Sequence, residues 1–395
     1  MDRETFEWLL TDDGQRLLAR AAHSYADHQG DPVAAASSLR SVGGEGPERS
    51  AAALTQVQLR VRAVPKLGED ALRMYFTPDG LEQATRTRVA EHRAARLVAA
   101  DVGTVIDLGC GVGGDLVAFA RAGLTAAGVD LDPVRVAVAR ANLAALGLPG
   151  AVQVADLTEV DVSGFGAAFA DPARRSGRGR IFDVEGWTPP WSVVSGLLRG
   201  RAVVKVAPGI PHSLVPGDVE AEWVSDHGEV KEAALWSPYL ATCRRRATVI
   251  GTGGLATLTE EDDPYDGSPR PLRDLGTYLY EPDGAVIRAG LVTAVAGGVQ
   301  GGLLDARIAY VTSDMGFRSP FARAFRIIEE LPYREKQLKA ALRARHIGAL
   351  TIKKRGVQIS PETLRRRLVL VGDETATLVL TRRAGTGVAM LVEPL

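Results

Sequence analysis

The spacing of apolar residues indicates helices in the first quarter of the chain. From Phe6 onward, residues 1–98 place apolar side chains three to four positions apart, as one buried face of a helix requires. Gly30-Asp31-Pro32 interrupts this pattern, since glycine and proline break helices. A further helix is expected over residues 78–99, because Thr77 can cap it and a proline follows at the first helical position. We therefore expect an N-terminal helical region over residues 1–98.

Short apolar runs then alternate with helical segments over residues 99–255. Such alternation is typical of a parallel sheet with crossover helices. The expected strands are 102–108, 125–130, 151–156, 166–171 and 202–207, and the expected helices start at Asp115, at Pro133 and near Trp187. We expect a Rossmann-like α/β domain over residues 99–255.

Three more apolar runs close this domain. Residues 221–225 and 229–236 flank the turn Asp226-His227-Gly228, which predicts an antiparallel hairpin, and residues 246–250 follow as another strand. We place the hairpin at the edge of the sheet. Residues 252–271 are rich in glycine, proline and acids and are therefore expected to be a linker.

The last third of the chain predicts a C-terminal α+β region. A short α+β segment is expected over residues 272–307, and a compact α+β domain over residues 308–395. Its expected elements are a strand, a helix over 320–331, a second helix over 334–345, and strands around Thr351 and Leu378.

Charge is distributed unevenly along the chain. The formal net charge is −1, yet residues 331–370 hold eleven lysines and arginines against two acids. A basic segment on an otherwise acidic chain favours an anionic partner such as a nucleic acid.

Cysteine usage and hydropathy exclude several classes of protein. Cys110 and Cys243 lie far apart without histidines at ligand spacing, so neither a disulfide framework nor a zinc site is expected, and we expect no metal. The N-terminus lacks the basic flank and apolar core of a secretory signal, and no run of about eighteen apolar residues predicts a membrane span. We therefore expect a cytoplasmic protein without a membrane partner.

A glycine-rich loop follows the first expected strand of the α/β domain. Gly109, Gly111 and Gly114, with Gly113 beside them, fit the spacing G-x-G-x-x-G, which nucleotide binders of several kinds share. Asp107, two residues before the first glycine, would repel a pyrophosphate but attract the ammonium group of a methionine moiety. The loop therefore favours S-adenosyl-L-methionine as the cofactor.

Acids also end the next two expected strands. Asp130 stands where a carboxylate can accept hydrogen bonds from ribose hydroxyls. Asp156 can accept one from the exocyclic amine of adenine, with Leu131 and Leu157 placed to sandwich the ring. The alternative for Asp156 is a local cap of a helix or turn, which we expect for Asp132 because a proline follows it. The edge hairpin favours the same cofactor, because dinucleotide-binding sheets lack it.

Asp171 and Pro172 follow the fourth expected strand, at the edge where open α/β sheets place their chemistry. The Asp171 carboxylate could accept a hydrogen bond from a substrate amine or hydroxyl and direct its lone pair to the methyl group. Positioning in a water-poor pocket supplies most of the acceleration in such a displacement. In amino-group methyltransferases that act on bases, a second proline and an aromatic residue stand where this chain has Ala173 and Arg174. The mechanism of those enzymes is therefore not simply transferred to this chain. A covalent pyrimidine mechanism is disfavoured, because no cysteine lies nearby in the sequence.

Cations surround this candidate reaction centre. The loop after Asp171 holds Arg174, Arg175, Arg178 and Arg180. These arginines could hold the phosphates of a polynucleotide or be solvated. Lys205 lies inside an expected central strand and needs a partner or an outlet to solvent. An ion pair with a nearby acid is the simpler interpretation, and contact with the substrate or with Asp171 is the alternative.

Seven short motifs stand in a characteristic order along the chain. They are Tyr75-Phe76-Thr77, Leu81-Glu82-Gln83-Ala84-Thr85, Asp107-Leu108-Gly109-Cys110-Gly111, Asp171-Pro172-Ala173-Arg174-Arg175, Lys205-Val206-Ala207-Pro208-Gly209-Ile210, Tyr280-Glu281-Pro282-Asp283 and Thr312-Ser313-Asp314. Their order resembles that of bacterial class I methyltransferases with a C-terminal THUMP-like domain. The resemblance implies a methyltransferase core that uses S-adenosyl-L-methionine, a ferredoxin-like segment within residues 272–307 and a THUMP-like domain over residues 308–395.

THUMP domains bind RNA, chiefly transfer RNA, so the resemblance also implies an RNA partner. The basic residues of the expected domain are Arg343, Arg345, Lys353, Lys354, Arg355, Arg365, Arg366 and Arg367. They could track phosphates, or form a solvated surface, and the scarcity of aromatic residues favours reading of RNA shape. We expect substrate contacts at Lys353, Lys354 and Arg355, together with Arg174 and Arg175.

The sequence thus predicts a methyltransferase that uses S-adenosyl-L-methionine and acts on structured RNA, either transfer RNA or ribosomal RNA. One alternative is a protein or small-molecule methyltransferase. Another is a non-catalytic RNA-binding protein that retains affinity for the cofactor. The sequence leaves the oligomeric state open.

Overall fold

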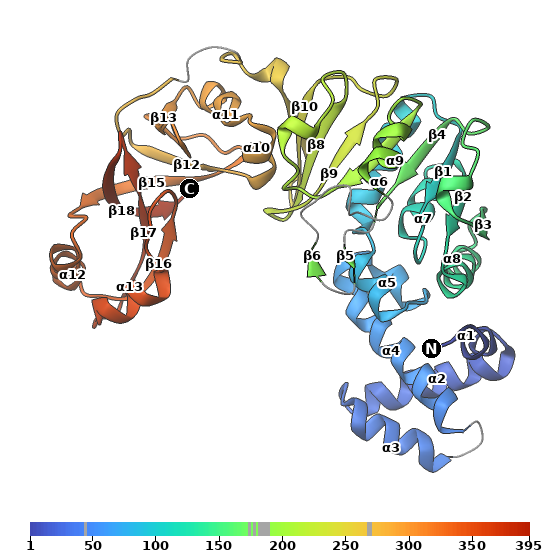
Figure 1. The fold of residues 1–395 in the computed structure, drawn as a ribbon. Helices are drawn as coiled ribbons and strands as arrows, with labels where there is room; N and C mark the ends of the chain where they lie inside the picture. The colour runs from blue at the N-terminus through green and yellow to red at the C-terminus, as the bar shows by residue number, and fades with distance from the viewer. Residues whose placement is uncertain (43–45, 173–174, 177–178, 181–189, 267–270) are drawn as a thin grey trace. The chain divides into compact units, whose positions relative to one another are not determined.

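The structure is a computed structural model that describes residues 1–42, 46–172, 175–176, 179–180, 190–266 and 271–395 (Figure 1). Two compact units divide the chain. The first comprises Met1–Val206 with Leu235–Ala241, and the second comprises Ala207–Ala234 with Thr242–Leu395. Among the described helices, none is long and apolar enough to cross a membrane.

Helices make up the N-terminal part of the first unit. They are α1 (Arg3–Leu9), α2 (Asp12–Asp27), α3 (Pro32–Val42), α4 (Pro47–Leu67), the 3-10 turn η1 (Glu69–Leu72), α5 (Pro78–Gln83) and α6 (Thr87–Ala99). The predicted break falls between α2 and α3, and the predicted apolar face is buried at Phe6, Leu9 and Leu17. Helix α1 packs on α8 (Pro133–Leu146), which ties this helical part to the sheet of the same unit.

The continuous helix expected over residues 78–99 is two helices. Thr77 caps α5 as predicted, because its hydroxyl accepts a hydrogen bond from the Gly80 amide at 3.0 Å. The backbone then becomes extended at Ala84 and Arg86, so α5 ends and α6 starts afresh. Thr85 explains the break, since its hydroxyl donates to the buried Asp115 carboxylate at 2.7 Å and is drawn toward the sheet.

The sheet of the first unit is parallel, as predicted. Its strands run in the order β7-β4-β1-β2-β3. They are β1 (Thr104–Leu108), β2 (Thr125–Asp130), β3 (Ala151–Val154), β4 (Ala167–Ala170) and β7 (Ala202–Val206), with crossover helices α7 (Gly114–Arg121), α8 and α9 (Trp191–Leu197). A 3-10 turn η2 (Leu157–Glu159) follows β3, and the short strands β5 (Arg175–Ser176) and β6 (Gly179–Arg180) follow β4. The expected helix start near Trp187 lies outside the described residues.

The predicted hairpin follows the 3-10 turn η4 (His212–Leu214) and belongs to the second unit, except for the last two residues of its second strand, Leu235 and Trp236, which belong to the first. Strands β8 (Glu220–Asp226) and β9 (Glu229–Trp236) are neighbours joined at His227 and Gly228, which both have positive φ, as a two-residue hairpin turn requires. The hairpin is not at the edge of its sheet, however, because two more strands follow β8 in the strand order. Strand β10 (Arg245–Gly251) pairs in parallel with β8, and β11 (Gly254–Thr259) pairs antiparallel with β10.

Strand β11 corrects the expectation of a linker over residues 252–271. Glycines stand at the turn between β10 and β11, where Gly251 pairs with Gly254 and Gly254 has φ +106°. They therefore serve a tight hairpin turn and not a flexible connection. The 3-10 turn η5 (Glu260–Asp262) follows directly.

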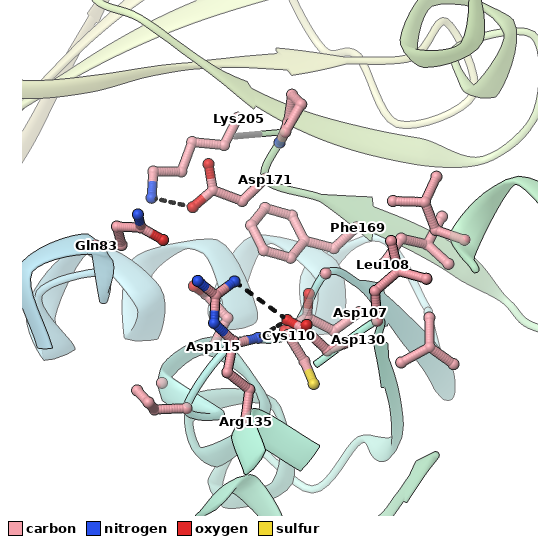
Figure 2. Close-up of a pocket in the computed structure, with 18 of the residues that line it drawn as sticks. Gln83, Asp107, Leu108, Cys110, Asp115, Asp130, Arg135, Phe169, Asp171 and Lys205 are labelled. Carbon is pink, nitrogen blue, oxygen red and sulfur yellow. Dashed lines mark hydrogen bonds and ion pairs between the residues drawn. The ribbon is translucent and has the colours of Figure 1, made fainter. Parts of the chain in front are cut away.

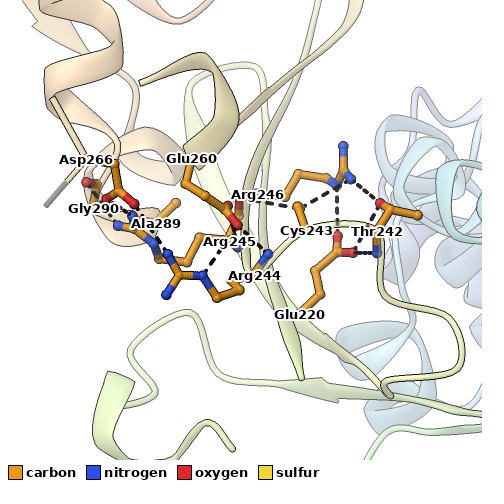
Figure 3. Close-up of polar contacts among 10 residues, drawn as sticks. All are labelled: Glu220, Thr242, Cys243, Arg244, Arg245, Arg246, Glu260, Asp266, Ala289 and Gly290. Carbon is orange, nitrogen blue, oxygen red and sulfur yellow. Dashed lines mark hydrogen bonds and ion pairs between the residues drawn. The ribbon is translucent and has the colours of Figure 1, made fainter. Parts of the chain in front are cut away.

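Three successive arginines anchor the start of β10 (Figure 3). Arg246 Nε donates to the fully buried Glu220 carboxylate at 2.8 Å, and the backbone amides of Arg244 and Arg245 donate to Glu260. The Arg245 guanidinium also reaches the carbonyl oxygens at the end of α10 (Gly284–Ala289). These cations stabilise the unit internally.

A second sheet holds the rest of this unit in the order β13-β14-β12-β15-β18-β17-β16. Its strands are β12 (Tyr278–Pro282), β13 (Gly302–Asp305), β14 (Ile308–Ser313), β15 (Ala322–Leu331), β16 (Ile347–Lys354), β17 (Glu374–Arg383) and β18 (Thr386–Pro394), and its helices are α10, α11 (Val292–Gly298), α12 (Glu335–Ala344) and α13 (Pro361–Leu368). Leucines of α12 and α13 pack into one core with β16, β17 and β18.

The helix expected over residues 320–331 is the strand β15. It pairs with β12 on one side and β18 on the other. The register of β15 against β18 shifts between Ile327 and Glu329, which interrupts the strand alternation: Ile328 is exposed, and Glu329, which pairs with Leu391, is half-buried. Arg345 makes this possible, since its guanidinium donates to both Glu329 oxygens at 2.5 and 2.6 Å. The helix expected over 334–345 is confirmed as α12.

Candidate active site

A cavity of about 560 Å³ opens at the carboxyl ends of β1, β2, β4 and β7 (Figure 2). This is the edge at which open α/β sheets bind their ligands, and the volume suits a nucleotide-sized molecule. The predicted Asp107, Asp130 and Asp171 all line it, and residues of the α5–α6 connection, including Thr85, contribute to its wall. All of these residues belong to the first unit.

Asp107 is a buried carboxylate at the base of this cavity. Its side chain is 1% exposed, and its Oδ1 has no hydrogen-bond partner among the described residues. Burial, reinforced by the neighbouring carboxylates of Asp115 and Asp171, raises the pKa of Asp107. A cationic ligand at Oδ1 would compensate both the burial and the repulsion. The ammonium group of a methionine moiety fits this carboxylate, whereas a phosphate would add to the repulsion.

The glycine loop turns sharply between β1 and α7. Gly109, Gly111 and Gly113 have φ of +95°, +55° and +83°, a region that residues with a Cβ rarely occupy. At Gly113 a Cβ would also lie 3.2 Å from the Ala139 Cβ. The loop thus requires glycine at these positions, which agrees with a backbone that wraps a ligand closely.

Asp130 anchors this loop from the end of β2. Its Oδ2 accepts a hydrogen bond from the Gly111 amide at 3.0 Å, and its Oδ1 accepts one from the Asp132 amide at 2.9 Å. Because each carboxylate oxygen has two lone pairs, both oxygens can still accept from ribose hydroxyls. Leu131, which is 61% exposed, follows it on the cavity wall.

Asp156 and Leu157 also line the cavity, after β3. Asp156 in addition caps η2, since its Oδ1 accepts from the Thr158 amide at 2.9 Å and hydroxyl at 2.7 Å, and these bonds lower its pKa. The local role expected as its alternative is therefore present beside the cavity position. Asp132 caps α8 as predicted, accepting from the Val134 amide at 2.8 Å.

Lys205 and Asp171 form an ion pair in the cavity, with Nζ 2.5 Å from Oδ2 (Figure 2). The sequence offered an ion pair with a nearby acid and a contact with Asp171 as alternatives for Lys205. The two are the same contact, because the nearby acid is Asp171. Lys205 also donates to the Thr85 hydroxyl at 3.1 Å. Of the neighbouring basic loop, Arg174 and Arg178 lie outside the described residues, and only the backbone is described for Arg175 and Arg180.

The site contains a buried arginine that the sequence analysis missed. Arg93 on α6 is 1% exposed and pairs with the Asp115 carboxylate at the start of α7. Its guanidinium also stacks 4.4 Å from the Phe169 ring centroid on the cavity wall. A signal was available, because Arg93 falls on the apolar face of α6 at helical spacing from Val89 and Leu97.

Asn142, the single asparagine of the chain, was also missed. From α8 it accepts a hydrogen bond from the Tyr75 amide at 2.6 Å and donates to the Tyr75 and Val112 carbonyls at 3.0 and 2.8 Å. Gln56 of α4 makes the equivalent pair of bonds to Phe76, at 2.7 and 3.0 Å. Two buried amides thus link the N-terminal helices, residues 75–76 and the glycine loop.

Burial and charge disfavour the Cys110 thiol as a nucleophile in this site. It is buried beside Asp107 and Asp130, and burial together with these carboxylates raises its pKa far above neutrality. A protonated thiol is a poor nucleophile. Within the described residues, no group of three or more His, Cys, Asp or Glu side chains is placed to hold a metal ion.

The fold and the site define a class of protein. The parallel strands have this order and are extended by a hairpin, and a glycine loop lies between acids at the ends of β1 and β2. This is the arrangement of a class I methyltransferase, whose cofactor is S-adenosyl-L-methionine. Residues 105–171 match the family described as methyltransferase domain, and residues 322–394 match that described as THUMP domain-like. Residues 2–63 match a domain of unknown function.

Relatives place the chain within one family. It is 40% identical over 338 residues to an uncharacterized S-adenosylmethionine-dependent methyltransferase of Mycobacterium tuberculosis, found in strains CDC 1551 and H37Rv; the match covers 82% of this chain and 90% of the relative. The chain therefore belongs to the S-adenosylmethionine-dependent methyltransferases. A crystal structure of a proposed methyltransferase from Porphyromonas gingivalis W83 has the same fold, with a TM-score of 0.75, 23% identity and coverage of 96% of this chain and 98% of that one.

Proposed function

We propose that this methyltransferase acts on structured RNA in the cytoplasm and that its THUMP-like domain binds the RNA backbone. The observation that carries the proposal is an exposed basic face on the THUMP-like domain. It consists of Lys336 and Arg343 on α12, Lys354 at the end of β16, and Arg365, Arg366 and Arg367 on α13. We name these residues the α12–α13 basic face.

The packing of the two helices turns these cations outward. Leu338 and Leu342 of α12, and Leu364 and Leu368 of α13, are buried against the sheet. Most of the other residues of the two helices are exposed, and Glu335, which pairs with Arg367 at 3.4 Å, and Glu362 are the only acids within the two helices. An excess of positive charge on one exposed surface is what phosphate binding requires.

Hydrogen bonds also hold the two helices side by side. Lys339 Nζ donates to the Arg367 carbonyl at 3.1 Å, and the Arg343 guanidinium donates to the Val369 carbonyl at 2.8 Å. The spacing of the cations is thus fixed by the fold. A fixed array of cations with few aromatic residues favours recognition of a folded RNA by its shape.

The structure separates the basic residues expected to contact substrate. Lys353 and Arg355 are half-buried and lie 2.6 and 3.9 Å from the Glu281 carboxylate, so this acid offsets part of their charge. Lys354, between them in the sequence, is exposed. We therefore propose Lys354 and the helical residues as the main phosphate contacts, with Lys353 and Arg355 contributing less.

At the catalytic end we propose the roles expected from the sequence. Asp107, Asp130 and Asp156, with Leu131, Leu157 and the loop at Gly109, Gly111 and Gly113, hold the cofactor. Asp171, followed by Pro172, receives the acceptor group of the RNA, because it stands on the same cavity wall beside Lys205. Arg174 and Arg175 follow it in the sequence and are proposed to hold a neighbouring phosphate.

Binding of transfer RNA at several salt concentrations tests the proposal. Lys354→Gln with Arg366→Gln should weaken binding by about tenfold near 0.1 M salt and should reduce the slope of log K against log salt by about two, because two phosphate contacts are lost. Arg318→Gln, an exposed arginine in the loop before β15, is the matched control and should bind as the unchanged protein does. Equal affinity and slope in all three proteins would contradict an RNA-binding role for this face.

A further inference from the structure

We infer that the methylated atom is a hydroxyl oxygen, activated jointly by Asp171 and Lys205. The inference deepens the proposed function and rests on it in one respect: if the substrate is RNA, the acceptor is a ribose 2′-hydroxyl, which RNA carries at every internal nucleotide. It follows from the place of the ion pair, from the contacts that fix it and from the charge that each kind of acceptor develops.

The parallel register of β4 and β7 brings the two residues together. Ala170 at the end of β4 pairs with Val204 of β7, so Asp171, directly after β4, and Lys205, the next residue of β7, stand at corresponding positions. Lys205 Nζ lies 2.5 Å from Asp171 Oδ2, and the two side chains are 14% and 32% exposed, respectively. Both line the cavity that Asp107 and Asp130 also line, so the pair stands where the cofactor and the acceptor meet.

A chain of hydrogen bonds fixes the ammonium group of Lys205. Lys205 donates to the Thr85 hydroxyl at 3.1 Å, and this hydroxyl donates to the Asp115 carboxylate at 2.7 Å. Asp115 in turn is paired with the buried Arg93. Because Thr85 gives its only proton to Asp115, its oxygen lone pairs are left to accept from Lys205. Lys205 therefore cannot turn away without breaking its contacts with Thr85 and Asp171. The break between α5 and α6 therefore serves to place this cation.

An ion pair at this position suits a hydroxyl acceptor better than an amine. An amine attacks as a neutral group and becomes cationic as the methyl group transfers, which a fixed ammonium beside it would oppose. A hydroxyl must lose its proton and develops negative charge, which the ammonium stabilises while the carboxylate accepts the proton. The sequence agrees, since Ala173-Arg174 offers no aromatic side chain to stack on a base.

The reaction balances without a further reactant. The hydroxyl oxygen forms a bond to the methyl carbon as the bond between that carbon and the sulfonium sulfur breaks. The electron pair of the broken bond stays on sulfur, which leaves neutral S-adenosylhomocysteine. The hydroxyl proton passes to the Asp171 carboxylate and then to water. The product is a methyl ether.

The chemical identity of the product tests the inference directly. The full-length protein is incubated with tritiated S-adenosyl-L-methionine and with RNA, protein and small-molecule extracts of cells that lack its gene. We expect label in RNA, and alkaline hydrolysis should leave it in dinucleotides, because a methylated 2′-oxygen cannot attack the neighbouring phosphate. Label in a methylated base, released as a mononucleotide, would overturn the inference but leave the RNA function intact.

The other outcomes separate the two proposals. Label confined to protein or small molecules would overturn the RNA function. In that case a methyl ether product would still support the inference of a hydroxyl acceptor, whereas an N-methyl or carboxyl-ester product would overturn it. Label in no fraction would overturn both.

Substitution of the lysine tests its role in the same assay. Lys205→Met should lower kcat by about 100-fold or more, and move the rise of rate with pH to higher pH, while the cofactor Kd changes by less than about threefold. Lys231→Met is the matched control: Lys231 on β9 is 18% exposed and pairs with Glu229, and it lies outside the cavity. Unchanged kcat and pH profile for Lys205→Met, or an equal loss in the control, would contradict the assignment.

Discussion

At the scale of single residues, Asp107 determines how the cavity discriminates between ligands. Replacing it with asparagine removes the charge that we propose meets the methionine ammonium. We expect Asp107→Asn to weaken binding of S-adenosylhomocysteine by about 2 to 5 kcal/mol, as measured by titration calorimetry. The ligand-free variant should melt at a higher temperature than the unchanged protein, because a buried, uncompensated carboxylate is gone.

The raised pKa of Asp107 makes a pH dependence part of the same prediction. The ammonium requires an ionised carboxylate, so affinity should rise with pH through the raised pKa, and binding below it should release a proton. The sign for stability is opposite: the ligand-free protein loses stability as pH rises through that pKa, because ionisation is costly in the buried site. Asp161→Asn, at an exposed turn outside the cavity, should leave the pH dependence of cofactor affinity unchanged. Affinity that does not change with pH over the range in which the protein stays folded would contradict this role of Asp107.

The sequence could predict some site residues because strand ends fix their positions. Asp107, Asp130, Asp171 and Lys205 each stand at or next to the end of a parallel strand, and these ends share one edge. Thr85 could not be predicted, because its place depends on a break between two helices that continuous helical spacing conceals.

At the scale of elements, Asn142 joins three segments that are distant in the sequence. Asn142→Ala would leave the Tyr75 amide, the Tyr75 carbonyl and the Val112 carbonyl without their partner. We expect a loss of about 3 kcal/mol of unfolding free energy, measured by denaturant titration, and weaker cofactor binding, since Val112 belongs to the glycine loop. Gln153→Ala removes an exposed amide from β3 and should have neither effect. Equal stability of the two variants would show that this link does not stabilise the fold.

The elements also show where sequence patterns are ambiguous. The parallel strands, the hairpin and α12 follow from periodicity and turn residues. Strand β15 does not, because Arg345 from α12 allows Glu329 to occupy an inward position that alternation reserves for apolar residues. Strand β11 was missed because glycines mark both linkers and tight turns, and only a pairing partner distinguishes the two.

At the scale of the whole molecule, charge and chemistry belong to different units. The first unit holds the acidic cavity for a cationic cofactor, and the second holds the α12–α13 basic face. A basic surface on a separate unit is what the proposed binding of a large polyanion requires. The family membership supports the first unit's chemistry, and the surface charge supports the choice of RNA.

The most direct test of this account is mass spectrometry of nucleosides from cells with and without the gene. We expect one methylated nucleoside to be absent from the RNA of the deletion strain and to be restored by the unchanged gene but not by an Asp171→Ala variant that still binds S-adenosylhomocysteine. An identical set of methylated nucleosides in the two strains, or full restoration by Asp171→Ala, would contradict it.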